Sequence, residues 1–427
     1  MKVLVVGAGG REHALSWKIS QSTLVTSVFV APGNGGTELE DHLTNVDIQA
    51  DDIEGLASFA LEQGIDLTIV GPEDPLVNGI TDRFNDLGLK CFGPSKGAAQ
   101  LEGSKEFMKD FLQRHHIPTA EYSSFSDTER AIEYVEQKGC PIVIKADGLA
   151  AGKGVTIAHT VEEAKEAIYQ SLESEVFGEA GKKIVIEEFL DGEEASFIVM
   201  TDGTNVIPFA SSQDHKALED NDKGPNTGGM GAYSPAPIVD EYVHEKIMNE
   251  IIFPTLKGLR KDGYKYCGFL YAGMMIDKNK KLKVLEFNCR FGDPETQPIM
   301  MRLKSDLASL CDQACDDNLI EQPLEWDSRK AIGVVLAARG YPHGYAKGKD
   351  ITNIPLEKDD LKIFHAGTKI ESNSLKSNGG RVLCVTSLGD SVESAQNKAY
   401  DAISEIEWED AFYRKDIGYR AIARERK

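Results

Sequence analysis

Glu286 and Asn288 are two oxygen-bearing residues that alternate with Leu285 and Phe287 in a short apolar segment. In a β-strand, neighbouring side chains point to opposite faces, so Glu286 and Asn288 would share one face and Leu285 and Phe287 the other. Two oxygen ligands about 7 Å apart on a strand suit Mg²⁺ that also binds nucleotide phosphates. The alternative is a strand with a polar, solvent-facing side. Arg290 follows and could bind a phosphoryl or carboxylate oxygen.

Residues 148–154 form a glycine-rich segment that ends in Gly152, Lys153 and Gly154. It differs from a Walker loop because its glycine spacing is too short, no Ser or Thr follows the lysine, and a strand is predicted next. We expect these three residues to lie in a flap between antiparallel strands that can fold over a triphosphate. Lys145 lies in the preceding apolar strand, where its ammonium either reaches solvent or is aimed at an anion.

Two further segments have the composition of binding sites. The apolar residues 184–186 lead into an acidic pair at 187–188 and an apolar pair at 189–190, which would form either an adenine slot or an edge strand with a hairpin. Residues 213–216 (Gln-Asp-His-Lys) are followed by a glycine run at 224–231. Such a run is typical either of close backbone approach to another group or of a flexible surface loop.

The segment Gly7-x-Gly9 follows a predicted strand, but its resemblance to a dinucleotide-binding loop is weak. Glu12 occupies the third glycine position, and no acidic residue follows the next strand to bind a ribose. A helix start beside Arg11 does suit one phosphate group. The alternative is that these glycines only form a tight turn.

The first hundred residues alternate between strand and helix patterns. Strands are predicted at 2–6, 28–30 and 67–70, and helices at 11–20, 53–63 and 76–87. This rhythm predicts an open parallel α/β sheet, which binds ligands beyond the carboxyl ends of its strands. The glycine- and proline-rich loops 7–12, 32–37 and 71–75 lie at that edge.

The remaining chain predicts mixed α+β units. Strands at 142–145, 155–158 and 184–187 combine with helices at 105–115, 127–137 and 162–171. Antiparallel strands at 196–200, 206–209, 268–276 and 283–287 surround a long helix at 241–260. We therefore expect an α/β and α+β multidomain protein with domains 1–103, 104–193, 194–325 and 326–427, the last a small mixed α/β domain.

The composition of the chain limits the kinds of partner that it is expected to bind. The 427 residues are 41% hydrophobic and 27% charged, and 47 Lys and Arg against 69 Asp and Glu give a net charge of −22. This charge disfavours nucleic acid and anionic membranes as partners. No segment approaches the roughly 18–20 apolar residues of a membrane span. The seven scattered cysteines indicate free thiols, and Cys311 and Cys315 alone do not make a zinc site. We expect a cytoplasmic monomer.

Together these segments resemble the ATP-grasp superfamily and, within it, the ligases that join glycine to 5-phosphoribosylamine. The matching segments cover essentially the whole chain: 7–14, 145–154, 224–231, 286–295, 365–368 and 379–383. The resemblance implies ATP with Mg²⁺ or Mn²⁺, a glycyl phosphate intermediate, and the products glycinamide ribonucleotide, ADP and phosphate. The nearest alternative is another ATP-grasp carboxylate–amine ligase; an NAD-dependent dehydrogenase and a non-catalytic nucleotide-binding protein are more distant ones.

The resemblance also implies roles for individual residues. ATP would be bound by Lys105, Lys145, Gly152, Lys153, Gly154, Glu187, Leu190 and Glu194, and the metal by Glu286 and Asn288. The phosphate of phosphoribosylamine would lie at Gly9, Gly10, Arg11, Asn34 and Gly35, and glycine at Asp214, Lys216, Asp293 and Pro294. Arg290, Lys145 and Asp214 would act in catalysis. Many ATP-grasp enzymes carry a further metal-binding carboxylate on the preceding strand, but residues 270–276 contain none.

Overall fold

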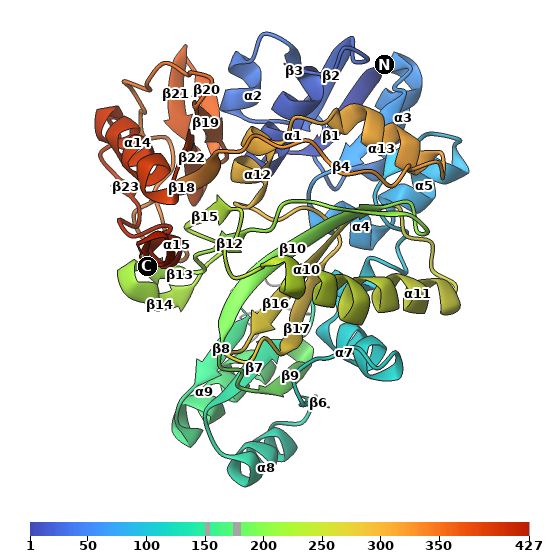
Figure 1. The fold of residues 1–427 in the computed structure, drawn as a ribbon, viewed down its shortest axis with the longest axis vertical. Coiled ribbons are helices and arrows are strands. Elements are labelled where there is room, and N and C mark those ends of the chain that lie inside the picture. The colour runs from blue at the N-terminus through green and yellow to red at the C-terminus, as the bar shows by residue number, and fades with distance from the viewer. Residues whose placement is uncertain (150–153, 174–180, 427) are drawn as a thin grey trace.

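The computed structural model describes residues 1–149, 154–173 and 181–426, so Gly152 and Lys153 lie outside the described residues. The N-terminal and C-terminal parts lie side by side at one end of the molecule, and a smaller sheet lies at the other end (Figure 1). The predicted α/β and α+β multidomain class is confirmed. Among the helices of the described residues, none is both long and apolar enough to cross a lipid bilayer.

The N-terminal part is a parallel five-stranded sheet in the order β3-β2-β1-β4-β5. Its strands are β1 (Lys2–Gly7), β2 (Ser27–Pro32), β3 (Leu43–Asn45), β4 (Leu67–Val70) and β5 (Cys91–Phe92). Its helices are α1 (Gly10–Ser20), α2 (Gly35–Leu39), α3 (Ile53–Gln63), α4 (Glu73–Asn78) and α5 (Ile80–Asp86). The winding direction reverses at β1, which is where open α/β sheets bind ligands. The helix predicted at 76–87 is two helices, because Gly79 adopts a left-handed φ of 95° between them.

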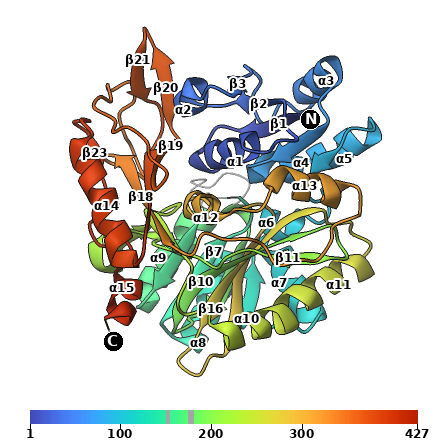
Figure 2. The ribbon, with the colours of Figure 1, turned by 45° about the horizontal axis from the view of Figure 1, so that its top comes forward.

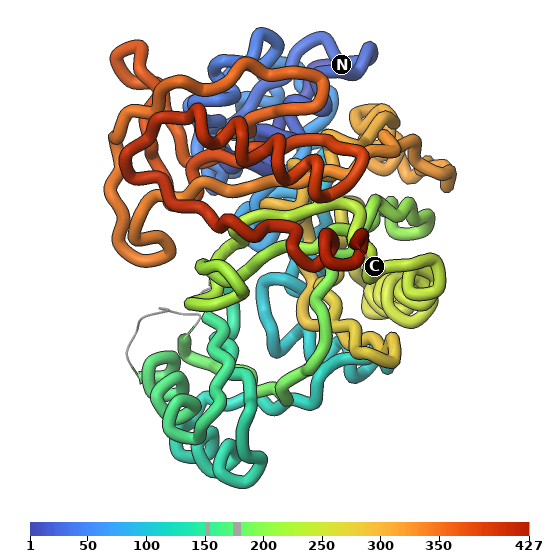
Figure 3. The backbone as a smooth tube through the Cα atoms, turned by 60° about the vertical axis from the view of Figure 1, so that its left-hand side comes forward, coloured from blue at the N-terminus to red at the C-terminus, as the bar shows by residue number. Residues whose placement is uncertain are grey.

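A small antiparallel sheet has the order β6-β9-β7-β8. It consists of β6 (Tyr122–Phe125), β7 (Ile142–Ala146), β8 (Val155–Ala158) and β9 (Ile184–Glu188), with helices α8 (Thr128–Lys138) and α9 (Val161–Leu172). These elements share a hydrophobic cluster of their own and project from the rest of the molecule (Figure 3). Helices α6 (Gln100–Gly103) and α7 (Lys105–Arg114) connect the sheet to the N-terminal part.

The central antiparallel sheet has the order β11-β10-β16-β17. It contains β10 (Glu193–Thr201), β11 (Val206–Pro208), β16 (Gly268–Ile276) and β17 (Leu282–Asn288). The predicted long helix is α10 (Glu241–Ile247), a π-helical turn (Met248–Ile252) and α11 (Phe253–Lys261). Pro254 follows the π-helical turn and has no N–H to donate, which accounts for the local change in hydrogen bonding.

The third main sheet joins the C-terminal strands to the middle of the chain, in the order β12-β15-β18-β22-β19 with β23 on β18. Its strands are β12 (Gln213–Asp214), β15 (Gly231–Ser234), β18 (Lys330–Ala338), β19 (Leu361–His365), β22 (Arg381–Gly389) and β23 (Ala411–Phe412). The hairpins β13–β14 (Ala217–Glu219, Lys223–Asn226) and β20–β21 (Thr368–Glu371, Ser374–Ser377) extend from it, with a 3₁₀ turn at Asp220–Asp222. The helices of the chain after residue 295 are α12 (Thr296–Arg302), α13 (Leu307–Cys315), α14 (Val392–Glu405) and α15 (Tyr419–Glu425) (Figure 2). This sheet crosses the predicted boundary at 325.

The N-terminal and central sheets share hydrophobic clusters. Val3 and Val5 of β1 belong to the same buried cluster as Ile198 of β10. The rings of Phe92 and Phe269 meet edge to face with their centroids 4.9 Å apart. This shared core holds the loops at the carboxyl edge of the parallel sheet against the central strands. All seven cysteines are free, as predicted.

Candidate active site

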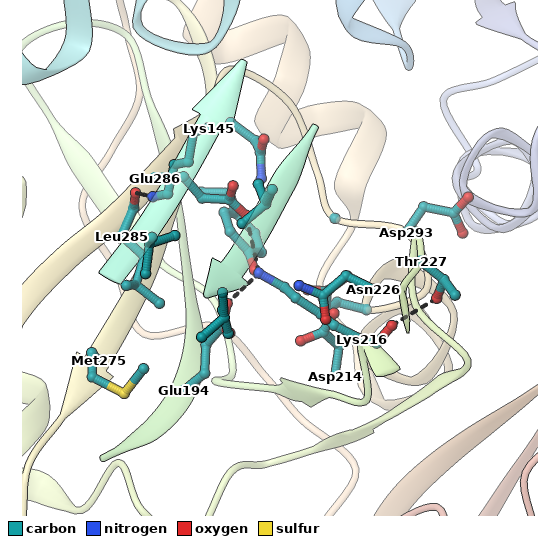
Figure 4. A pocket seen from close by; sticks show the side chains of 18 of the residues that line it. Lys145, Glu194, Asp214, Lys216, Asn226, Thr227, Met275, Leu285, Glu286 and Asp293 are labelled. Carbon is teal, nitrogen blue, oxygen red and sulfur yellow. Dashed lines mark hydrogen bonds and ion pairs between the residues drawn. The ribbon is translucent and has the colours of Figure 1, made fainter. Parts of the chain in front are cut away.

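A cavity of about 460 Å³ lies between the small sheet, the central sheet, the N-terminal loops and the C-terminal strand β22 (Figure 4). One part of its lining is apolar: Val143, Val155, Ile157, Phe189, Leu190, Met275 and Leu285. The other part is densely charged. The predicted site residues that line it are Arg11, Lys145, Glu187, Leu190, Glu194, Asp214, Lys216, Glu286, Asn288, Arg290 and Asp293. Residues distant in sequence therefore meet in one cavity.

The strand β17 presents both predicted metal ligands to this cavity. The pairing with β16 shifts register between Gly273, which pairs with Glu286, and Met274, which pairs with Val284, so Leu285 is the extra residue of a β-bulge in β17. Leu285 therefore lines the cavity together with Glu286, and the prediction that Leu285 faces away from Glu286 is wrong. Strict alternation fails because the bulge inserts one extra residue; it resumes at Phe287, which is buried.

Lys216 sits between two carboxylates at the charged end of the cavity (Figure 4). Its ammonium pairs with Glu194 and lies 3.1 Å from Oε1 of Glu286. The positive charge of Lys216 lowers the pKa of Glu286 to about 2, against the effect of burial. Glu286 is therefore ionised at neutral pH, as a metal ligand must be.

Lys145 is almost fully buried and is aimed inward. Its Nζ lies 2.9 Å from Oε1 of Glu187 and donates to the carbonyl oxygen of Leu285 at 3.2 Å. The alternative that the Lys145 side chain only extends into solvent is therefore excluded. On the far side of Glu187, Oε2 lies 2.8 Å from Nζ of Lys109, a residue that we did not predict. The available signal was the position of Lys109 four residues after Lys105, on the same face of the predicted helix.

Lys105 holds the start of the glycine-rich segment. Its Nζ donates to the carbonyl oxygen of Gly148 at 2.8 Å, and its backbone N–H donates to Asp147 at 2.6 Å. At the other end of the segment, the carbonyl oxygen of Gly154 accepts from the N–H of Ala146 at 2.8 Å. Within the described part of the chain, neither Lys105 nor Gly154 belongs to the cavity lining.

Arg290 is anchored by two carboxylates from the N-terminal part. Its Nε donates to Glu73 at 3.1 Å, and its Nη2 lies 2.7 Å from Oε1 of Glu102. Burial acts to raise the pKa of Glu73, but Arg290 and Arg11 outweigh it and lower that pKa to about 2. Burial raises the pKa of Glu102 to about 7. Glu73 and Arg11 both line the cavity, so the loop 71–75 contributes a residue that we did not single out.

The half-buried carboxyl group of Asp214 and the buried one of Glu295 lie near Lys216. Burial and the nearby charge of Glu295 raise the pKa of Asp214 well above its usual range. Burial also raises the pKa of Glu295, whose Oε1 accepts a hydrogen bond from Ser196 at 2.9 Å. This end of the cavity is therefore acidic, and it suits a ligand that carries an ammonium or hydroxyl groups.

Asp293 is held by Arg381 of β22. The Nη2 of Arg381 lies 2.7 Å from Oδ2 of Asp293, and its Nη1 donates to the carbonyl oxygens of Asp293 and Gly228. Gly229 has a φ of 111°, and a Cβ there would lie 2.4 Å from Cδ of Pro294. The glycine run is thus a close backbone contact around Pro294 and Asp293, and the interpretation as a flexible surface loop is wrong.

The N-terminal glycine loop packs around a carboxylate. Oε2 of Glu12 accepts from the N–H of Gly9 at 2.6 Å, and Oε1 accepts from Nε of Arg11 at 2.5 Å. A Cβ at Gly10 would lie 2.6 Å from Nε2 of Gln297. These glycines allow close packing of protein side chains.

The second N-terminal loop is held in the same way. The side chain of Asn34 caps α2 by accepting from the N–H groups of Gly36 and Thr37, and it donates to the carbonyl oxygens of Ala8 and His365. A Cβ at Gly35 would lie 2.9 Å from Leu375 of the β20–β21 hairpin. Gly9, Gly10, Asn34, Gly35 and Pro294 are outside the cavity lining formed by the described residues.

Comparison with known proteins bears directly on this arrangement. Profiles described as phosphoribosylglycinamide synthetase match three consecutive stretches: the N domain at residues 1–102, the ATP-grasp (A) domain at 103–296 and the C domain at 331–420. The chain belongs to the phosphoribosylglycinamide synthetase family. It is 61% identical to a phosphoribosylamine–glycine ligase of Escherichia coli O157:H7 over 427 residues, which is 100% of both chains.

Solved structures agree with this assignment. The phosphoribosylamine–glycine ligase of Thermotoga maritima superimposes with a TM-score of 0.86 at 35% identity, covering 98% of this chain and 100% of that one. A biotin carboxylase domain of Hydrogenobacter thermophilus 2-oxoglutarate carboxylase, at 17% identity, has a TM-score of 0.74 and covers 96% of this chain and 91% of its own. This second likeness concerns the fold alone. The prediction of an ATP-grasp ligase of the synthetase family is confirmed.

Proposed function

We propose that this member of the synthetase family joins glycine to 5-phosphoribosylamine at the cavity described above, using ATP. The observation that carries this proposal is the 61% identity to a phosphoribosylamine–glycine ligase over the full length of both chains. In the first step a carboxylate oxygen of glycine attacks the γ-phosphorus of ATP, giving glycyl phosphate and ADP. In the second, the amine attacks the acyl carbon, phosphate leaves and the amine loses a proton. Both steps develop negative charge on phosphoryl oxygens, which cationic side chains stabilise.

The two halves of the cavity suggest how the substrates are distributed. The apolar part, with Leu190, Phe189 and Met275, suits an adenine base, and Glu187 and Glu194 adjoin it. Lys145 contacts Glu187 and the carbonyl oxygen of Leu285, the residue before Glu286, so the triphosphate would extend past Lys145 toward the proposed metal ligands. We infer that Lys105, Gly152, Lys153 and Gly154 complete the phosphate site when the glycine-rich segment closes.

The other substrates would lie at the charged part. Asp214, Lys216, Asp293 and Pro294 surround the position that we assign to glycine, with the acidic pair Asp214 and Glu295 receiving its ammonium. Arg290 would steady the transferred phosphoryl group. The loops that hold Gly9, Gly10, Arg11, Asn34 and Gly35 would bound the phosphoribosylamine site, with Arg11 as the residue that reaches the cavity.

Divalent metal would bind at Glu286 and Asn288, and its charge would draw the phosphate oxygens of ATP into position. Glu286 is ionised and Asn288 shares its face of β17, so this pair fits Mg²⁺, and equally Mn²⁺. Within the described residues, no three His, Cys, Asp or Glu side chains are grouped to hold a metal by themselves. The protein's two ligands therefore fit a cation that takes its remaining ligands from phosphates and water.

The test is substrate dependence of ADP formation. Purified protein with ATP and Mg²⁺ should release ADP only when both glycine and phosphoribosylamine are supplied, the latter formed in solution from ribose 5-phosphate and ammonia. Mass spectrometry should detect glycinamide ribonucleotide. Product formation with bicarbonate or another amino acid in place of glycine, at a higher kcat/KM, would transfer the assignment to a different ATP-grasp ligase. Repeating the assay with Mn²⁺ tests which metals support turnover.

A further inference from the structure

Lys109 is a charged side chain with no exposed surface. It projects from α7, behind Glu187 as seen from the cavity, and it is not itself among the cavity-lining residues of the described chain. Its Nζ lies 2.8 Å from Oε2 of Glu187 and donates to Oγ1 of Thr119 at 2.8 Å. Burying a charge so completely is costly unless it is paired. The function described so far assigns it no task.

The carboxylate of Glu187 is shared between two lysines. Its Oε1 faces Lys145 at 2.9 Å and its Oε2 faces Lys109 at 2.8 Å, and Glu187 is itself buried. Two ammonium groups and one carboxylate carry a net charge of +1. Without Lys109, Lys145 and Glu187 would form a neutral pair. A neutral pair would attract the phosphates of a nucleotide far less than a group that keeps a positive charge.

We propose that Lys109 is a positioning residue for nucleotide binding, which neutralises Glu187 and thereby leaves the charge of Lys145 available to the triphosphate. This inference rests on the proposed function, because it takes the cavity to bind ATP. It predicts that loss of Lys109 weakens ATP binding, and that removing the negative charge of Glu187 as well restores part of the affinity.

A purely structural role for Lys109 makes a different prediction. Thr119 donates in turn to the carbonyl oxygen of Val284 at 2.9 Å, so Lys109 also ties α7 to β17. If this tie were its only task, a double variant that lacks both Lys109 and the charge of Glu187 would bind ATP no more tightly than Lys109→Met, because both variants lose the donor to Thr119. The charge-based role predicts instead that the second substitution compensates for the first.

The experiment measures the dissociation constant of MgATP in the absence of the other substrates. Lys109→Met should weaken binding by about tenfold or more, because the remaining pair is neutral. The double variant Lys109→Met/Glu187→Gln again carries +1, so it should bind MgATP at least about threefold more tightly than Lys109→Met. Lys165→Met, which removes a surface lysine paired with Glu136 on the same small sheet unit, is the matched control and should bind like the wild type.

The pH dependence supplies a second measurement. Burial lowers the pKa of Lys109 to about 8, against the opposing charge of Glu187 and together with the repulsion of Lys145. Glu188 and the ring of Tyr122 also face this ammonium. ATP affinity of the wild type should therefore fall as pH rises through about 8, when Lys109 loses its proton. Lys109→Arg keeps its charge and should flatten this profile.

The affinity of the wild-type protein for MgATP is measured first. A wild-type protein that does not bind MgATP would refute the proposed function rather than the role of Lys109. Given wild-type binding, the role is refuted if Lys109→Met binds ATP normally, or if the double variant binds no more tightly than the single one. Circular dichroism and thermal midpoints establish that each variant is folded. Should Lys109→Met not fold, the pH profile of Lys109→Arg decides, and a profile unchanged from the wild type overturns the proposal.

Discussion

The ammonium of Lys216 lies 3.1 Å from Oε1 of Glu286, so the proposed metal ligand is paired with a cationic side chain. Glu194 binds the same ammonium. A divalent ion at Glu286 would repel Lys216, which can remain paired with Glu194. The structure thus shows how Glu286 is kept ionised, and it suggests that metal binding and the position of Lys216 are coupled.

Replacing Glu286 by Ala should reduce turnover by at least about 100-fold while leaving the protein folded, because it removes one of the two proposed metal ligands. The apparent Mg²⁺ requirement should rise as well. Steady-state kinetics at several Mg²⁺ concentrations, with a thermal midpoint for each protein, provide the measurement. Glu250→Ala removes an exposed carboxylate of the π-helical turn and should change neither value. A folded Glu286→Ala protein with near-normal kcat would refute the metal assignment.

Gly229→Ala should lower kcat/KM by about tenfold or more and destabilise the fold by about 1–3 kcal/mol. The residue combines a φ of 111° with a Cβ position only 2.4 Å from Pro294 and 3.6 Å from Asp214. Gly263→Ala separates the two causes, since Gly263 has a φ of 85° with nothing within 4 Å of the added carbon. Equal losses of activity in the two variants would show that displacement of Pro294 and Asp214 is unimportant.

Arg381→Lys should lower kcat/KM by about 10- to 100-fold despite keeping the charge, because a lysine cannot make both the carboxylate and the carbonyl contacts of Arg381. Asp293 and the carbonyl oxygens of Gly228 and Gly229 would lose donors. Kinetics with glycine and phosphoribosylamine varied separately would locate the defect. Arg426→Lys, at an exposed ion pair with Glu393, should be neutral. Normal kinetics of Arg381→Lys would mean that the contacts between Arg381 and Asp293 do not position a substrate.

Stability should fall on mild acidification through His365. Burial lowers the pKa of His365 to about 3, whereas an unfolded histidine has a pKa near 6.5. Between these values the unfolded chain binds a proton that the folded chain does not. The contribution of His365 to the free energy of unfolding is therefore fully present above about pH 6.5 and declines as pH falls toward 3. Lowering the pH from 6.5 to 5 should cost about 2 kcal/mol through this residue alone.

The measurement for His365 is urea unfolding at several pH values. His365→Gln removes the titrating group and should lose less stability than the wild type over that interval, whatever its stability at neutral pH. His116 is exposed, so His116→Gln is the control and should retain the wild-type slope. Parallel slopes for His365→Gln and the wild type would contradict a neutral, buried His365.

Local patterns in the sequence determined the strands and helices, and the motifs that mark the family. The alternation in the first hundred residues predicted the parallel sheet and located three loops at its ligand-binding edge. The residue types around Lys145, Glu187, Glu286 and Arg290 predicted an anion and metal site, and the structure brings all four to one cavity. These features are readable because periodicity and residue chemistry act over a few neighbouring residues.

Only the tertiary structure decided which of those residues face one another. The bulge that turns Leu285 toward the cavity depends on pairing with another strand, and Glu73 and Arg381 reach it from positions more than 300 residues apart. The burial of Lys109 behind Glu187 likewise depends on how α7 packs against the small sheet. Burial and long-range pairing set the charge and orientation of these groups, and neither quantity is contained in the spacing of residues along the chain.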